Sequence, residues 1–335
     1  MEDKIERKRL TILKLLSETQ EPVSSLILEE QMKNWGYEVS ERTIRLYLKA
    51  LDEEGLTKPV IKKGRLITKK GLSELSKARV SEKVGFLSAR INQMIYQMNF
   101  NLNTKKGSIV LNISFIEKKD LERSVELMYR VFHAKYSMGS LLTLFHEGEY
   151  VYNTFIPEGY LGIGTVCSIT VNGVLLSHGI PVNSRFGGLL ELNEGKPVRF
   201  TEIINYDGTT IDPLEIFIKA GLTDYTGATK NGNGLIGASF REIPMESREK
   251  VIEIAKSLEK IGLASFMEIG WPEQNLLQIP VNEGAIGAII IGGLNPVAIL
   301  EEQGIKVYSK ALSSLIEYEK LFSYQELLSR YKSFM

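Results

Sequence analysis

The first 54 residues contain three amphipathic helical patterns in close succession. Apolar residues recur at spacings of three and four over residues 3–18, 24–35 and 41–54, which is the spacing of one face of a helix. Glycines end the second and third patterns, and Ser40 is a favoured N-cap for the third. Helices this short and this close together are expected to pack around one small core.

A basic hairpin pattern follows the third helix. Residues 60–63 and 65–68 are short apolar and basic stretches around Gly64, and the whole segment 56–70 contains no acidic residue. Three helices followed by such a hairpin are the order of a winged helix-turn-helix, whose third helix enters the major groove of DNA. We therefore predict this fold and double-stranded DNA as a partner for residues 1–70. A protein-binding winged helix is the alternative, but it leaves the acid-free wing unexplained.

The outward face of the third helix carries the candidate DNA contacts. At about 100° per residue, Arg42, Arg45 and Lys49 lie within about 60° of one another, away from the apolar face. Basic residues on a short helix are often only solvated, but arginine suits both guanine edges and phosphates. The candidate DNA-binding residues are Ser40, Arg42, Thr43, Arg45, Lys49, Lys62, Lys63 and Arg65.

A further helical pattern runs over residues 71–100, where Leu75, Leu87, Ile91 and Met94 are among the apolar positions. This stretch is longer than a wing needs as an exit. DNA-binding proteins of this kind commonly pair so that two recognition helices lie one helical turn apart. We therefore predict a linker and dimerisation helix here, and a homodimer or higher oligomer.

The remaining residues, 101–335, contain a duplicated pattern. Each copy begins with a strand that ends in Ser-Phe, continues with an amphipathic helix and returns with a second strand. The first copy has these elements at 107–115, 118–134 and 139–145, and the second copy has them at 234–240, 246–262 and 264–269.

The second halves of the two copies also match. Glycine-rich strands after Gly162 and Gly284 lead to turns at Asn172 and Asn295, and then to an apolar stretch and Gly-Ile-x-Val. A Phe-Thr or Phe-Ser segment follows, at residues 200 and 322. The fold class is therefore α+β: a winged helix-turn-helix followed by a duplicated, two-lobed α+β effector domain. The repeats cover about 101–230 and 231–335, and a cleft between two such lobes is a natural ligand site.

The winged helix, the segment GIGTVCSITVNGVLLSHGIPVNSRFGG and the segment GAIGAIIIGGLNPVAILEEQGIKV resemble the archaeal nitrogen-regulation repressors of the NrpR family. The resemblance covers the whole chain, as one winged helix and one effector domain. It implies a repressor of nitrogen-assimilation genes that 2-oxoglutarate releases from its operator. Some members carry two effector domains, so a paralogue could be a partner. Sensing of a different metabolite is the alternative within this class.

A dicarboxylate effector needs arginine, hydroxyl or backbone N–H donors. The densest clusters of such groups contain Thr165, Cys167 and Ser168, then Ser184 and Arg185, and finally Lys230 and Asn231 at the junction of the repeats. Arg185 is the best single candidate for a carboxylate clamp, although a loop arginine is more often a surface ion-pair partner. The glycines of 284–293 more plausibly permit close strand packing than phosphate binding.

An enzyme is the rival class, with Cys167 as nucleophile and His178 as base. A lone cysteine in an apolar segment is more often a small buried residue, and the three histidines have no zinc-ligand spacing, so we expect no enzyme, no metal and no cofactor. An architectural DNA-binding protein would not need two lobes. The single cysteine and the charged N-terminus without a signal peptide suggest the cytoplasm rather than a membrane.

Overall fold

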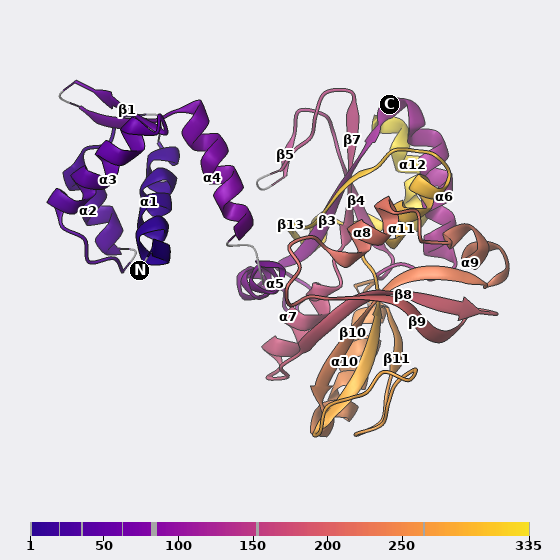
Figure 1. Ribbon diagram of the computed structural model, residues 1–335. Helices are drawn as coiled ribbons and strands as arrows, with labels where there is room; N and C mark the ends of the chain where they lie inside the picture. Colours follow the sequence, from indigo (N-terminus) through magenta and orange to yellow (C-terminus); the bar gives the residue numbers. More distant parts are fainter. Residues whose placement is uncertain are drawn as a thin grey trace. The chain divides into compact units, whose positions relative to one another are not determined.

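The computed structural model describes residues 2–19, 21–34, 36–61, 63–81, 86–151, 154–263 and 265–334. The chain forms two compact units, Met1–Val84 and Gly85–Met335 (Figure 1). Within the described ranges, no helix is both long enough and apolar enough to cross a membrane.

The first unit is a three-helix core with a two-stranded wing. Its elements are α1 (Glu2–Ser17), α2 (Ser25–Asn34), α3 (Glu41–Glu53), β1 (Thr57–Val60), β2 (Gly64–Ile67) and α4 (Lys69–Ser81). The apolar residues that recur at helical spacing form its core, as predicted: Ile12, Leu13, Leu16, Leu28, Met32, Ile44, Leu48 and Leu51 are all buried. The predicted last residue of the second helix, Trp35, lies outside the described residues.

The wing begins earlier than the sequence pattern suggested. β1 and β2 are antiparallel and pair Thr57 with Ile67 and Val60 with Gly64, so the predicted strand over 60–63 is wrong. The strand starts early because Leu56 and Thr57 are buried against the helices. Gly64 lies in a strand rather than at the turn, at φ 122°, and a Cβ there would be 2.2 Å from the carbonyl oxygen of Val23. Glycine therefore allows β2 to approach the chain just before α2.

The segment predicted as one linker and dimerisation helix contains two helices, α4 and α5 (Phe86–Gln97). Leu75 of α4 is buried in the core of the first unit, whereas Leu87, Ile91 and Met94 of α5 are buried in the core of the second. These apolar residues are therefore occupied within the chain and are not available for a dimer contact. Dimerisation itself stays a prediction.

The second unit contains both repeats. The first has β3 (Ser108–Glu117), α6 (Leu121–His133), β4 (Leu141–Phe145), β7 (Tyr160–Val166), α7 (Ile169–Ser177) and β8 (Asn183–Asn193). The same order returns in β10 (Gly234–Pro244), α10 (Arg248–Lys260), β11 (Phe266–Ile269), β12 (Ala285–Ile291), α11 (Asn295–Glu302) and β13 (Tyr308–Glu317). The predicted strand, helix and strand that open each repeat are confirmed, although the predicted start of β11 at Ala264 lies outside the described residues.

Smaller elements connect or extend these. They are the hairpin β5 (Tyr150–Val151) and β6 (Thr154–Phe155), the strands β9 (Lys196–Asn205) and β14 (Phe322–Ser323), and the helices α8 (Pro213–Lys219), α9 (Tyr225–Asn231) and α12 (Leu327–Arg330).

Each repeat contributes two strands to the sheet of the other repeat. The sheets have the orders β13-β3-β7-β4-β14 and β11-β12-β10-β8-β9, with antiparallel neighbours. Three strands of each sheet come from one repeat, and the strand beside the repeat's first strand comes from the other. β13 of the second repeat thus pairs with β3, and the equivalent β8 of the first repeat pairs with β10. The lobes are therefore interlocked.

Two parts of the predicted repeat are wrong. Asn172 and Asn295 lie in helices α7 and α11 rather than in turns, and the apolar stretches after them are the rest of those helices. Both helices are apolar on nearly all sides because they are buried, so no periodic pattern marks them as helical. The segments at Phe200 and Phe322 are not equivalent either, since β9 extends one sheet next to β8 and β14 extends the other next to β4.

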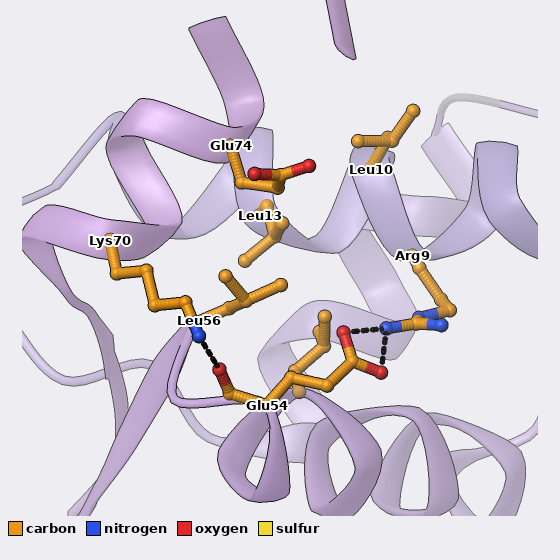
Figure 2. Close-up of a pocket in the computed structure, with 8 residues that line it drawn as sticks. Arg9, Leu10, Leu13, Glu54, Leu56, Lys70 and Glu74 are labelled. Atoms are coloured by element: carbon orange, nitrogen blue, oxygen red, sulfur yellow. Dashed lines mark hydrogen bonds and ion pairs between the residues drawn. The ribbon is translucent and has the colours of Figure 1, made fainter. Parts of the chain in front are cut away.

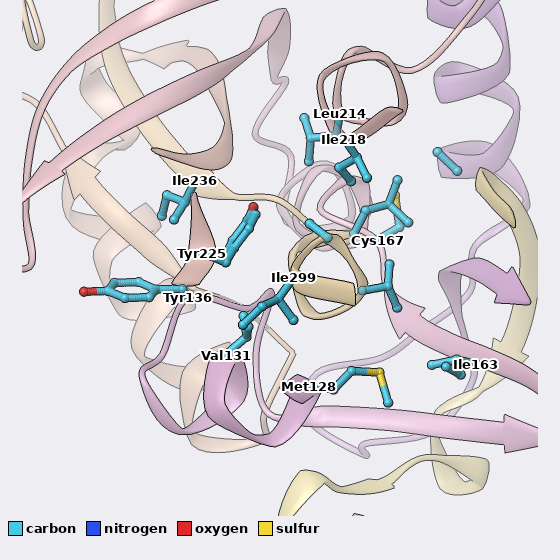
Figure 3. Close-up of a cluster of buried hydrophobic side chains, with 14 of the residues drawn as sticks. Met128, Val131, Tyr136, Ile163, Cys167, Leu214, Ile218, Tyr225, Ile236 and Ile299 are labelled. Atoms are coloured by element: carbon cyan, nitrogen blue, oxygen red, sulfur yellow. The ribbon is translucent and has the colours of Figure 1, made fainter. Parts of the chain in front are cut away.

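Buried side chains from both repeats share one hydrophobic cluster (Figure 3). Met128 and Val131 of α6 lie with Ile299 of α11 in this cluster, and Cys167 and Leu214 also belong to it. The start of α7 and the start of α11 are thus held inside the same core.

Candidate functional site

Helix α3 begins with a well-formed cap. The Ser40 hydroxyl accepts a hydrogen bond from the Thr43 backbone N–H at 3.4 Å and lies 3.0 Å from the Thr43 hydroxyl. These two candidate DNA-binding residues therefore also fix the start of the helix. Arg42 is exposed on its first turn and makes no hydrogen bond or ion pair with any described residue. Its guanidinium is free to meet DNA.

Arg45 is held against α2. Its Nη2 donates to Glu41 Oε1 at 2.6 Å and its Nε donates to the Ser25 hydroxyl at 3.3 Å. The Ser25 hydroxyl also donates to Glu41, and this bond together with Arg45 lowers the pKa of the Glu41 carboxyl. Arg45 therefore joins α2 to α3 while its side chain stays 65% exposed. Lys49 is exposed one turn further on, 3.9 Å from Glu53.

In the wing, Arg65 is held by an ion pair and Lys63 is exposed. Arg65 Nε donates to Asp52 Oδ2 at 3.2 Å, and Asp52 also accepts from the Thr57 hydroxyl, so Arg65 joins the wing to the end of α3. Lys63 is exposed in the turn between the strands. The third wing candidate, Lys62, lies outside the described residues.

Lys63→Ala should make DNA binding less sensitive to salt without changing the preferred sequence. A wing lysine that contacts phosphate releases a counterion, so its loss should reduce the slope of log affinity against log salt by about 0.9. Binding measured at several salt concentrations, on a preferred and a scrambled duplex, gives this slope. A changed base preference in Lys63→Ala would contradict the wing assignment.

A groove of about 320 Å³ lies behind the recognition helix (Figure 2). Leu13, Leu51 and Leu56 line it. At its rim Arg9 Nη2 contacts both carboxylate oxygens of Glu54, at 2.5 and 2.6 Å, and Lys70 Nζ donates to the Glu54 carbonyl at 2.7 Å. These bonds hold the end of α3 between α1 and α4.

In the second unit, a small cavity lies where the two repeats face each other. Each repeat contributes the turn between its glycine-rich strand and the following buried helix: Cys167 and Ser168 before α7, and Gly292 and Gly293 before α11. The turns are very close, since a Cβ at Gly293 would lie 2.4 Å from the carbonyl oxygen of Val166. The cavity volume is about 20 Å³, which is room for about one water molecule.

A buried arginine lies beside this cavity. Arg241 of β10 is fully buried, and its Nη2 and Nε donate to Ser168 Oγ and to Asn172 Oδ1, each at 3.3 Å. Its guanidinium carbon lies 5.4 Å from the centre of the Tyr206 ring. Its Nη1 is buried without a hydrogen-bond partner among the described residues. A buried guanidinium with a donor to spare is costly unless an anion can reach it.

The N-terminal ends of three helices lie around the same cavity. Ser168 precedes α7, Leu294 precedes α11, and Asp212 caps α8 by accepting from the Leu214 N–H at 2.9 Å. Helix N-termini carry partial positive charge and favour anions. Asp212 is the acidic exception, and burial raises the pKa of its carboxyl, which disfavours a negative charge there. The arrangement suits a small carboxylate ligand.

Cys167 is a structural residue rather than a nucleophile. Burial raises the pKa of its thiol to about 12. The expected base, His178, bonds through Nδ1 to the Val174 carbonyl oxygen at 2.8 Å. A thiol of this kind has very little of the reactive thiolate form at neutral pH.

A thiol reagent such as dithionitrobenzoate should therefore not modify the folded protein at pH 8. The raised pKa leaves roughly 1000-fold less thiolate than an ordinary cysteine has, and burial blocks access to the sulfur. The chain has one cysteine, so unfolding in guanidinium should release one thiol equivalent. Rapid modification of the folded chain, measured by absorbance, would contradict this assignment.

Two routes connect the cavity to α5, one through a second cavity and one through hydrogen bonds of Arg90. Asn172, which accepts from Arg241, donates to the Ser184 hydroxyl at 2.8 Å, and both residues line a second cavity of about 170 Å³ together with Ser88 and Asn92 of α5. In addition, Arg90 of α5 donates to the carbonyl oxygens of Ala311 and Leu312, both at 3.0 Å.

The Arg90 route reaches the cavity wall directly, because Ala311 lines the cavity. This part of the cavity wall is an irregular stretch of β13. In it Leu312 has φ 51°, and the Ala311 N–H donates a hydrogen bond to the Glu215 carboxylate. Burial raises the pKa of this Glu215 carboxyl to about 7.

The predicted effector residues separate into two groups. Cys167 and Ser168 line the cavity, Thr165 lies buried on the adjoining strand with its hydroxyl unpartnered among described residues, and Ser184 joins the network through Asn172. By contrast, Lys230 and Asn231 lie exposed at the end of α9 and do not line the cavity.

Arg185, the predicted clamp, already has a carboxylate partner. Its Nη1 donates to Glu242 Oε1 at 3.0 Å and to the Pro280 carbonyl oxygen. Arg241 was not among the predicted effector residues, although one signal was present: it and Glu242 are charged residues within a strand that is mostly apolar.

The fold defines a class of protein: a winged helix-turn-helix regulator with a duplicated α+β domain. Residues 84–323 match the family model described as NrpR regulatory domains NRD1 and 2, and residues 10–75 match the model of the ribonuclease R winged-helix domain. The chain belongs to the NrpR family. This family consists of regulators and not of enzymes.

Its relatives include the global nitrogen regulator NrpRI of Methanosarcina mazei, which is 36% identical over 96% of this chain and 99% of that protein. Global nitrogen regulator NrpR of Methanococcus maripaludis is 34% identical over 91% of this chain and 53% of that longer protein. A solved nitrogen repressor-like protein of Methanococcus jannaschii is similar in structure, with a TM-score of 0.60 and 27% identity over 70% of this chain and 97% of that chain.

Proposed function

We propose that this chain is a cytoplasmic, homodimeric transcriptional repressor of nitrogen-assimilation genes, and that 2-oxoglutarate releases it from its operator. The observation that carries the proposal is the buried Arg241, whose spare Nη1 lies beside a cavity ringed by helix N-termini. Its relatives, named global nitrogen regulators, support the nitrogen-related role. Thr165, Cys167, Ser168 and Ser184 remain candidate effector residues, and Arg241 joins them.

Charge explains why 2-oxoglutarate would be preferred over glutamate. One carboxylate of 2-oxoglutarate can accept hydrogen bonds from Arg241, and the other can accept hydrogen bonds from backbone N–H groups at the start of α11. Glutamate has the same length but adds an ammonium group, which the guanidinium and the helix N-termini would repel. Succinate keeps both carboxylates but lacks the keto oxygen and one carbon.

The small size of the cavity suggests how binding would be coupled to release. About 20 Å³ cannot hold a five-carbon ligand, so binding must move the two strand-to-helix turns apart. The ligand therefore favours a state in which the lobes are arranged differently. Release from DNA can be no larger than the difference in ligand affinity between the two states.

Calorimetric titration of the full chain with 2-oxoglutarate, glutamate and succinate tests the proposal. Selective binding of 2-oxoglutarate, together with weaker DNA binding in its presence, is the expected result. The absence of heat at millimolar 2-oxoglutarate would contradict the effector assignment and would leave a regulator that senses another metabolite or relies on a partner chain.

A further inference from the structure

We infer that Leu46 reads thymine methyl groups in the operator, as the apolar contact at the centre of the recognition helix. The inference rests on the proposed DNA binding and extends it to base specificity. Leu46 was not among the residues that the sequence pattern suggested as DNA contacts, because it is neither basic nor polar.

Leu46 lies on the side of α3 opposite the core. The buried residues of this helix are Ile44, Leu48 and Leu51, and at about 100° per residue Leu46 points almost directly away from them. Its side chain is 63% exposed. It lies in the second turn, four residues after Arg42 and three before Lys49, so its two nearest neighbours along this face are basic. A single exposed leucine is ordinary on a protein surface, but this one is flanked by the side chains expected to enter the groove.

Among the groups that the base edges present in the major groove, one is a favourable partner for an aliphatic side chain. The base edges there present N7, O6, O4, N4 and N6, all of which bind water or polar groups, and one apolar group, the C5-methyl of thymine. A branched aliphatic side chain pressed against the polar atoms would remove their water without replacing the hydrogen bonds, which is unfavourable. Against a thymine methyl, both partners lose apolar contact with water, which is favourable.

The other residues of this face leave the central position to Leu46. Arg45 is drawn aside by its bonds to Glu41 and Ser25, and Ser40 and Thr43 bond to each other at the start of the helix. Arg42, with no described partner, is available for a guanine or a phosphate. The face therefore combines one polar reader with one apolar reader, which predicts thymine next to the position read by Arg42.

Deoxyuridine substitution tests this assignment, because deoxyuridine differs from thymidine only by the absent methyl group. The probe is a duplex that the full chain itself selects from a random-sequence library. Each thymine of that duplex is replaced in turn, and affinity is measured for the wild-type chain and for Leu46→Ala. We expect one thymine per half-site at which the wild type loses about fourfold in affinity and Leu46→Ala loses nothing.

Leu72→Ala is the matched control, since Leu72 is also an exposed leucine of the same unit, 47% exposed, but on α4. It should keep the wild-type response to every substitution. Thermal unfolding of both variants should match the wild type because neither side chain is buried. If Leu46→Ala responded to deoxyuridine as the wild type does, or if no thymine methyl mattered, the inference would be overturned. If the chain selected no sequence at all, DNA reading itself would be refuted, and the inference with it.

Discussion

Arg241→Met should weaken the binding of 2-oxoglutarate at least about 100-fold while the chain still binds DNA. Two charge-assisted hydrogen bonds from the guanidinium to a carboxylate are together worth about 3–5 kcal/mol in this setting. Methionine has a similar volume but carries no charge. It also has no nitrogen atom that would be buried without a partner, as Nη1 of Arg241 is. The unliganded variant should fold but with lower stability, because Ser168 and Asn172 lose their hydrogen-bond partner. Calorimetry and DNA binding on the same preparation measure both effects.

Two variants serve as controls. Arg241→Lys keeps the charge but not the planar pair of donors, so it should recover part of the affinity. Arg185→Met removes the arginine that pairs with the buried Glu242 and should not affect 2-oxoglutarate binding, but it should lower stability by about 1–2 kcal/mol. This value is below that of a fully buried pair, because the Arg185 side chain is 31% exposed. Unchanged 2-oxoglutarate affinity in Arg241→Met would remove the cavity as the effector site.

Arg90→Met should uncouple the two sites. The variant should bind 2-oxoglutarate and DNA separately with nearly normal affinity, but the effector should change DNA affinity by less than about threefold, where typical coupling is about 5–150-fold. The reason is that Arg90 holds α5 to the carbonyl groups of Ala311 and Leu312 at the cavity wall. Helix α5 is the first element of the effector unit after the winged-helix unit in the chain.

Arg123→Met is the matched control for this experiment. Arg123 also donates through Nη2 to a backbone carbonyl, that of Gln303 at 3.2 Å, but Gln303 does not line the cavity. DNA affinity measured with and without saturating 2-oxoglutarate gives the coupling for each variant. Full coupling in Arg90→Met would show that the signal takes another route, such as the one through Asn172 and Ser184.

The secondary structure of the chain was predictable where one face of an element is buried. The recognition helix and the paired helices α6 and α10 show regular apolar spacing because their other faces meet water. Helices α7 and α11 were missed because they are buried on almost all sides, so their sequences carry no alternation between apolar and polar residues. The exchange of β8 and β13 between the repeats could not be predicted either, since a local sequence pattern does not show which strand pairs with which in a sheet.

The effector site was predictable only in part. Cys167 and Ser168 were predicted because a polar, glycine-rich turn is visible in sequence, and they line the cavity that is the candidate effector site. Arg185 was preferred to Arg241 on the ground that a charged side chain in a loop need not be buried. The predicted loop is wrong, since both arginines lie in strands, Arg185 in β8 and Arg241 in β10. Arg185 is neutralised by Glu242, whereas Arg241 is buried with a donor unused. Burial without a partner depends on the neighbouring strands, which the sequence alone does not place.

The exchanged strands have a consequence for the origin of the effector domain. In a single repeat the first strand pairs on one side with a strand of its own repeat, and its other edge would be open to aggregation. Two copies of one repeat could close each other's sheets, which makes a strand-exchanged homodimer the natural ancestor, with the present chain as the product of gene fusion. In such an ancestor the two strand-to-helix turns would have been identical. After fusion they were free to diverge, and only then could one turn become Cys167 and Ser168 and the other Gly292 and Gly293, giving a symmetric frame an asymmetric pocket.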